Sequence, residues 1–113
     1  MPIQPWSERI WVVHLADEPA LSEDLIAAHD QAARVDPMPQ LVIDFSAVRQ
    51  VNSSNLSQLL KLRKASIDRG SRLKLAAMTD SAWVVFLTTG LDKVFEFAED
   101  VPSALASIQI DSP

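Results

Sequence analysis

The feature that most constrains the fold is a short apolar run followed closely by a helical pattern. Residues 41–45 are nearly all apolar, include Val and Ile, and are too few for a buried helix. Residues 56–67 then carry apolar side chains at helical spacing, with basic residues between them. Gly70 follows, as a glycine often does just past a helix end. The stretch 41–70 therefore predicts a buried strand that leads into an amphipathic helix.

The rest of the chain repeats this alternation of strand and helix. Further strands are expected at 10–15, 73–78 and 94–97, and further helices at 20–35, 82–89 and 101–108. The expected inward face of the helix at 20–35 consists of Leu21, Leu25, Ala28 and Ala32. Pro2 and Pro5 restrict any strand at the N-terminus to a short one or a sheet edge. The pattern predicts an α/β fold: a mixed sheet of four to five strands with about four helices packed against it.

Size and composition indicate one domain over residues 1–113. The chain is 48% hydrophobic, has no cysteine, and carries a net charge of −5 from 15 acidic and 10 basic residues. The acidic balance argues against nucleic acid as a partner, since nucleic-acid affinity comes largely from clustered Lys and Arg. No apolar run approaches the roughly 20 residues that span a bilayer. The N-terminal residues also lack the basic start and apolar core of a signal peptide, so we expect a cytoplasmic protein without a membrane segment.

A polar cluster at residues 52–55, Asn-Ser-Ser-Asn, precedes the central helix and allows two interpretations. In the first, Ser53 or Ser54 is the N-cap, whose hydroxyl accepts a backbone N–H bond worth about 1 kcal/mol. In the second, one hydroxyl is a phosphorylation target. A phosphate would add roughly two negative charges at the positive end of the helix dipole, which tolerates an anion. Modification there would change the surface and leave the fold intact.

Several segments in order along the chain resemble the STAS domain family, which includes bacterial anti-sigma factor antagonists. The segments are Asp44-Phe45-Ser46, Val51-Asn52-Ser53-Ser54-Asn55-Leu56, Arg69-Gly70-Ser71-Arg72-Leu73 and Thr89-Gly90-Leu91-Asp92-Lys93-Val94-Phe95. The resemblance covers residues 10–108. It implies a signalling domain that binds an anti-sigma factor serine kinase, and so frees a sigma factor for transcription. Phosphorylation by that kinase breaks the contact, and a metal-dependent serine phosphatase restores it.

The same resemblance assigns roles to individual residues. It implies that Ser53 is the phosphorylated residue and Ser54 a structural hydroxyl. Two positions depart from the family pattern, because Asn52 stands where the family commonly has Asp, and Asn55 where it has Gly. Asn55 would place a larger polar side chain beside Ser53. The predicted partner-binding residues around Ser53 are Asn52, Ser54, Asn55, Lys61 and Lys64.

Alternative functions follow from the same residues. One is a STAS scaffold that assembles with itself or with other STAS chains in a signalling complex without a cognate sigma factor. Asp17, Asp44 and Lys93 suggest the acidic pocket of a phosphoacceptor receiver domain, but their spacing along the chain does not match that fold. Asp44 is then expected to accept hydrogen bonds from the turn that follows it. An enzyme would need a base for Ser53, but His14 and His29 lie on other elements and no Gly-x-Ser-x-Gly elbow is present. We therefore expect no catalysis, no cofactor and no metal site.

The helix expected at 82–89 is apolar on more than one side. Ala82, Val85 and Phe86 make its expected inward face, while Trp83, Val84 and Leu87 fall largely elsewhere. Either the terminal helix or the N-terminal segment covers this second group, or it forms a patch for self-association or for a partner.

Overall fold

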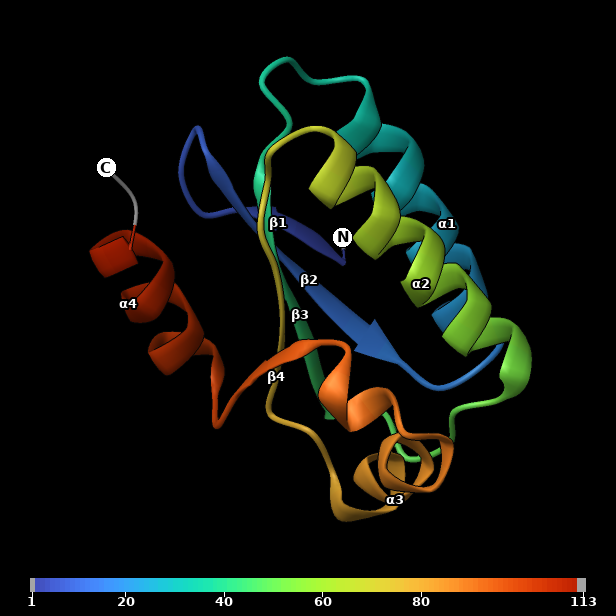
Figure 1. Ribbon diagram of the computed structural model, residues 1–113. Helices are drawn as coiled ribbons and strands as arrows, with labels where there is room; N and C mark the ends of the chain where they lie inside the picture. Colours follow the sequence, from blue (N-terminus) through green and yellow to red (C-terminus); the bar gives the residue numbers. More distant parts are fainter. Residues whose placement is uncertain (1, 112–113) are drawn as a thin grey trace.

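The computed structural model describes residues 2–111 and confirms the α/β architecture (Figure 1). The elements in chain order are β1 (Ile3–Pro5), β2 (Ile10–Ala16), α1 (Ala20–Ala33), β3 (Gln40–Ala47), α2 (Ser53–Asp68), β4 (Leu73–Ala76), α3 (Asp80–Thr89), the 3₁₀-helix η1 (Leu91–Lys93), β5 (Glu96–Ala98) and α4 (Val101–Asp111). Within residues 2–111, no helix has both the length and the apolar character needed to cross a bilayer.

The five strands form one mixed sheet in the order β1-β2-β3-β4-β5. β1 pairs antiparallel with β2, and the remaining neighbours are parallel. Parallel neighbours need a crossover connection, which α1, α2 and α3 supply. β1 is a three-residue edge strand that ends at Pro5, as the two N-terminal prolines predict. The carboxyl ends of β2 and β3 therefore lie side by side, next to the start of α2.

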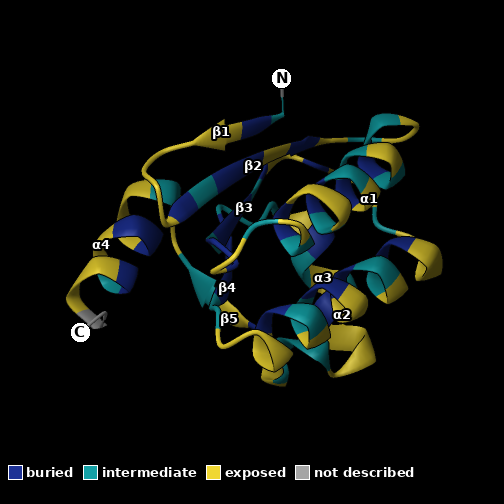
Figure 2. Ribbon diagram, turned by 90° about the horizontal axis from the view of Figure 1, so that it is seen from above, coloured by how far each residue is buried: buried dark blue, intermediate teal, exposed yellow. Residues whose placement is uncertain are grey.

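The main core lies between the sheet and α1, α2 and α3. Central strands contribute Val13, Ile43 and Leu75, all fully buried. The predicted inward face of α1 is confirmed: Leu21, Leu25, Ala28 and Ala32 are its buried residues. Figure 2 shows burial concentrated on the facing sides of sheet and helices, with the exposed residues on their outer sides.

The opposite face of the sheet is covered by α4 alone (Figure 1). A smaller cluster joins Ile10, Val12, Val42 and Ala76 to residues of α4, which are Ala104, Leu105 and Ile108. Lys74 is also buried on this face, and its Nζ donates to Ser107 Oγ. Beyond α4 this face is polar, because the next residues along β2 and β3 are His14 and Asp44.

Both glycines lie just past helices, as predicted. Gly70 has φ +70° and Gly90 has φ +77°, a left-handed conformation that glycine adopts without strain. The strand predicted at 73–78 ends earlier, at Ala76, because Ala77 takes a left-handed φ of 58° that ends the extended backbone. The strand predicted at 94–97 is β5, shifted to Glu96–Ala98 by the preceding 3₁₀ turn.

Candidate functional site

The start of α2 is held by two asparagines. Asn52 is the N-cap: Asn55 N donates to Asn52 Oδ1 at 2.8 Å, and Asn52 N donates to Asn55 Oδ1 at 2.9 Å. This reciprocal pair is a capping box, which satisfies N–H groups that the helix cannot satisfy itself. The prediction that Ser53 or Ser54 caps the helix is therefore wrong. The neighbouring amide does the capping, and both hydroxyls are left out of it.

Asn55 lies inside the molecule and not on the surface around Ser53. Its side chain is 0% exposed. Asn55 Nδ2 donates to Glu18 Oε2 and to Ser22 Oγ, each at 3.2 Å. These bonds tie α2 to the loop between β2 and α1 through Glu18, and to the first turn of α1 through Ser22. The expectation that Asn55 contacts a partner and stands beside Ser53 as a bulky surface group is corrected, because its polar atoms are used internally.

Ser53 and Ser54 are exposed in the first turn of α2. Within residues 2–111, neither hydroxyl makes a hydrogen bond. First-turn N–H groups lack intrahelical partners, and the aligned peptide dipoles give this end partial positive charge. Two free hydroxyls therefore stand at a place that can accept an anion.

Acidic side chains and one arginine surround this helix start. A cleft of about 450 Å³ is lined by the connections β2–α1 and β3–α2 and by α3, with the residues Asp17, Glu18, Arg49, Gln50, Val51, Asn52 and Val85. Asp17 Oδ1 accepts from the N–H groups of Arg49 at 2.8 Å and Gln50 at 3.1 Å. Hydrogen bonds from the hydroxyl and N–H of Ser22 lower the pKa of Glu18, so its carboxylate is charged at neutral pH. Asp17 and Glu18 were not among the predicted site residues. The available signal was their position at the carboxyl end of a strand that neighbours β3.

Lys61 and Lys64 lie on the exposed side of α2, further along the helix from Ser53. Ser53, Leu60 and Lys64 follow helical spacing along one stripe, and Leu60 is 38% exposed. Lys64 Nζ pairs with Asp68 Oδ2 at 2.8 Å, and that bond raises the pKa of the Lys64 ammonium. Both lysine ammonium groups therefore lie at the surface of α2.

The apolar residues of α3 divide into a covered and an exposed part. Trp83 is half-buried, and its ring packs edge-on against Phe97 of β5 with ring centroids 4.9 Å apart. Val84 and Leu87 are 56% and 49% exposed. α4 packs on the opposite face of the sheet, so it does not cover α3 (Figure 1). Only Val84 and Leu87 of the predicted patch therefore present substantial apolar surface.

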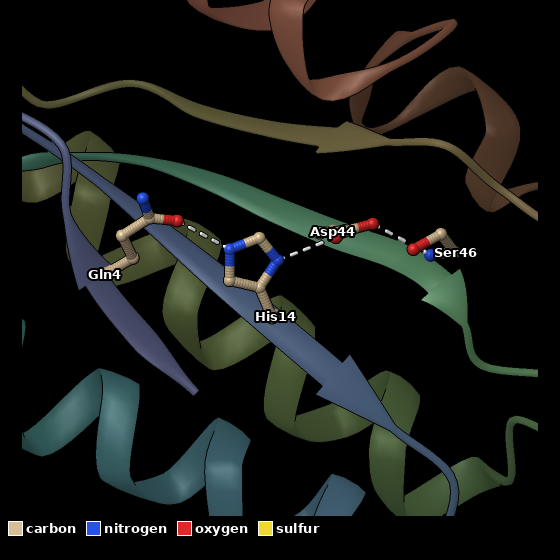
Figure 3. A network of polar contacts seen from close by, with 4 residues as sticks. All are labelled: Gln4, His14, Asp44 and Ser46. Carbon is tan, nitrogen blue, oxygen red and sulfur yellow. Dashed lines mark hydrogen bonds and ion pairs between the residues drawn. The ribbon is translucent and has the colours of Figure 1, made fainter. Parts of the chain in front are cut away.

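A polar network on the α4 side of the sheet resembles part of a catalytic relay (Figure 3). His14 Nδ1 lies 2.8 Å from Asp44 Oδ2, and His14 Nε2 lies 2.8 Å from Gln4 Oε1. Ser46 N donates to Asp44 Oδ1 at 2.9 Å, which agrees with the predicted role of Asp44. Burial alone would raise the pKa of Asp44, but the bonds from Ser46 and His14 outweigh burial and lower it. The partner of His14 Nε2 is the Gln4 amide and not a serine hydroxyl. The network therefore contains no nucleophile that His14 could activate.

The part of the chain that the structure describes, residues 2–111, contains no group of three or more His, Cys, Asp or Glu side chains placed to hold a metal ion. The charged groups at the start of α2 act through hydrogen bonds to the backbone and to amides instead.

Comparisons with known proteins agree with this geometry. The family model described as the STAS domain matches residues 10–104. No curated protein sequence matches the chain. Among solved structures, an anti-sigma-factor antagonist (STAS) domain protein from Planctomyces limnophilus is similar with a TM-score of 0.77 at 16% identity, over 88% of this chain and 91% of the other. A Moorella thermoacetica RsbS variant has a TM-score of 0.75 at 19% identity over 96% of both chains. Phosphorylated SpoIIAA from Bacillus has a TM-score of 0.69 at 15% identity, over 94% of this chain and 96% of the other.

Proposed function

Because the chain belongs to the STAS domain family, we propose that it is an anti-sigma factor antagonist whose partner binding is switched by phosphorylation of Ser53. The observation that carries the proposal is the Ser53 hydroxyl, exposed and without a hydrogen bond in residues 2–111. Because Asn52 and Asn55 cap the helix, the Ser53 hydroxyl is not needed for capping. The similarity to phosphorylated SpoIIAA and to an anti-sigma-factor antagonist domain protein supports the choice.

The charges around Ser53 give the switch its physical basis. In the unmodified state, the partner docks over Ser53 and the exposed stripe of α2, where Asn52, Ser54, Lys61 and Lys64 meet it. A phosphate adds about −1.5 to −2 charge at the start of α2, next in sequence to Asn52, which lines a cleft with Asp17 and Glu18, so this end of the domain becomes more acidic. The helix N-terminus and Arg49 offset part of that repulsion within the domain. Phosphorylation therefore abolishes docking without unfolding the chain.

The proposed partners are an anti-sigma factor serine kinase and a serine phosphatase. ATP and metal belong to those enzymes, and the domain itself binds by surface contact without catalysis. We place this exchange in the cytoplasm, where kinase and sigma factor would meet it.

A phosphorylation experiment tests the proposal. The protein is incubated with ATP and the serine kinase encoded beside it, and the phosphate is located by mass spectrometry. We expect one phosphate on Ser53, loss of it in Ser53→Ala, and its retention in the matched control Ser54→Ala. Ser53→Ala should still bind the kinase, whereas Ser53→Glu should bind at least about tenfold more weakly, which corresponds to 1.4 kcal/mol. Phosphate on Ser54 alone, or none at all, would contradict the switch.

A second candidate function is a STAS scaffold that forms a homodimer or assembles with other STAS chains. The exposed Val84 and Leu87 side chains of α3 favour it, because apolar groups at this exposure are stabilised by contact with another molecule. The similar solved structures include a component of the stressosome, a signal integration and transduction hub. Light scattering on the same preparation separates the two functions. A large assembly that Val84→Glu dissociates, with no phosphate on Ser53, would favour the scaffold.

A further inference from the structure

A second cleft is lined by the β1–β2 turn, the α1–β3 and α2–β4 connections and α4. Figure 1 shows that these connections lie at the end of the sheet opposite α3. The volume of the cleft is about 800 Å³, within the range of sites for small molecules. We call it the hairpin cleft, because the turn between β1 and β2 forms one wall. The other walls come from the connections α1–β3 and α2–β4 and from α4. Its lining includes Trp6, Arg9, Met38, Gln40, Arg72 and Gln109.

Backbone hydrogen bonds hold these walls in place. Gln40 N donates to Arg9 O at 2.7 Å, and Leu41 N donates to Arg72 O at 2.9 Å. These bonds fix the amino ends of β2, β3 and β4 in one row. Ser7 Oγ accepts from the N–H groups of Arg9 and Ile10, at 3.2 Å and 3.1 Å, which closes the hairpin turn. The cleft is therefore preformed, and a ligand would spend little free energy on ordering it.

One guanidinium of the hairpin cleft, that of Arg9, is available to an anion. The lining contains two arginines, Arg9 and Arg72, against one carboxylate, Glu8, although the whole chain carries a net charge of −5. Arg72 pairs with Glu96 at 3.0 Å. The guanidinium of Arg9 is exposed and makes no hydrogen bond or ion pair within residues 2–111. Arg9 therefore has its donors available for a carboxylate or phosphate oxygen.

Apolar groups stand beside these arginines. The Trp6 side chain is 43% exposed, and Met38 is buried at the base of the connection between α1 and β3. A half-exposed indole and a guanidinium in the same cleft offer a ligand a flat surface and a cation. Gln40 and Gln109 add amides at the rim.

We propose that the hairpin cleft binds a small molecule with a flat apolar body and one oxyanion, either a carboxylate or a phosphate. The Trp6 indole contacts the flat body and the Arg9 guanidinium holds the oxyanion, while Arg72, which is paired with Glu96, lines the same cleft. None of these residues lies at the start of α2, so this site is independent of the Ser53 proposal. A small molecule bound there would contact the domain at the end of the sheet remote from Ser53.

Titration of the ¹⁵N-labelled protein, followed by NMR, tests this inference. The probes are 2-naphthoate and 2-naphthyl phosphate, with neutral 2-naphthalenemethanol and inorganic phosphate as controls for the two halves of the ligand. We expect saturable shifts of the Trp6 indole N–H and of the Arg9 and Arg72 amides, with no shift at Ser53. Preference between the two naphthyl probes identifies the oxyanion. Arg9→Met should weaken binding about tenfold, as expected when a charge-assisted bond is lost, and Arg49→Met at the other end of the sheet should not.

Three results would overturn the inference. Equal binding of 2-naphthalenemethanol would show that no oxyanion is recognised, and equal binding of inorganic phosphate would show that no flat body is. Absence of a saturable Trp6 shift with either naphthyl probe would remove the site altogether. Because Arg9 is exposed, Arg9→Met should fold, and its own spectrum verifies this. Trp6→Leu provides a second variant, in which the apolar wall remains but the flat surface is lost.

Discussion

The two faces of the sheet differ in how much helix covers them and in what that leaves at the surface. α1, α2 and α3 pack on one face, where the central strands and the helices bury a continuous apolar cluster. α4 alone packs on the other face, over a smaller cluster around Val12, Val42 and Ile108. Beyond α4 that second face carries the Gln4–His14–Asp44 network in contact with solvent (Figure 3).

The difference shows which parts of the chain hold the fold and which remain available for other uses. On the three-helix face, the sheet and the helices bury most of their apolar side chains against one another, and the hydroxyls of Ser53 and Ser54, unbonded within residues 2–111, lie where α2 begins. On the α4 face, coverage is partial, and the hairpin cleft opens beside α4. Stability should therefore depend more strongly on the first face than on the second.

Removing one buried side chain from each face gives the largest expected effect. Leu62 on α2 and Ile108 on α4 are both 0% exposed. We expect Leu62→Ala to lower the free energy of unfolding by about 4 kcal/mol, because the surrounding core cannot collapse into the cavity. Ile108→Ala should cost about 2 kcal/mol, because α4 can move towards the sheet. Urea unfolding measures both, and equal losses would show that the two faces are equally constrained.

A smaller effect is expected from the cap of α2. Asn52→Ala removes the side chain that accepts from Asn55 N, and should lower the free energy of unfolding by about 1 kcal/mol. Ser53→Ala, one residue later, should change it by less than about 0.5 kcal/mol, because the hydroxyl has no partner in residues 2–111. Thermal unfolding of the pair provides the measurement. A larger loss of stability for Ser53→Ala than for Asn52→Ala would show that the serine caps the helix.

The smallest effect is the dependence of the α4 cap on pH. Asp100 Oδ1 accepts from Ser103 N at 2.8 Å, and bonds from the hydroxyl and N–H of Ser103 lower the pKa of Asp100 below its ordinary 3.8. Its contribution is therefore fully present above pH 3.8 and is lost as the pH falls through the lower pKa of the folded state. Asn52, which caps α2, does not titrate.

Amide hydrogen exchange in the first turn of α4 should consequently accelerate in acid. In Asp100→Asn the amide can still cap the helix, so α4 should lose this pH dependence and keep its protection. Simultaneous loss of protection in α2 and α4 of the unmodified protein would show that the acid response is global and unrelated to the cap.

Much of the fold was predictable because it depends on local patterns. The apolar runs at β2 and β3, the inward face of α1, and the glycines after α2 and α3 all follow from residues close together in sequence. The exposed position of Ser53 at a helix start followed in the same way. The cap was misassigned because asparagine and serine are both good N-caps, and residue type alone does not choose between them.

Contacts between distant segments were beyond prediction. The burial of Asn55 depends on Glu18 and Ser22, more than 30 residues away along the chain. The packing of Trp83 depends on Phe97 of β5. The hairpin cleft brings together four segments that share no pattern.

The sequence by itself determined the order of strands and helices, the places where helices begin and end, and the hydroxyls at the start of α2. Hydrophobic period and turn chemistry act over a few residues, so they can be read from a single chain. The tertiary structure alone decided which polar groups are satisfied inside and which remain at the surface. That outcome depends on side chains brought together by packing, such as Glu18 with Asn55, and sequence spacing does not encode such distances.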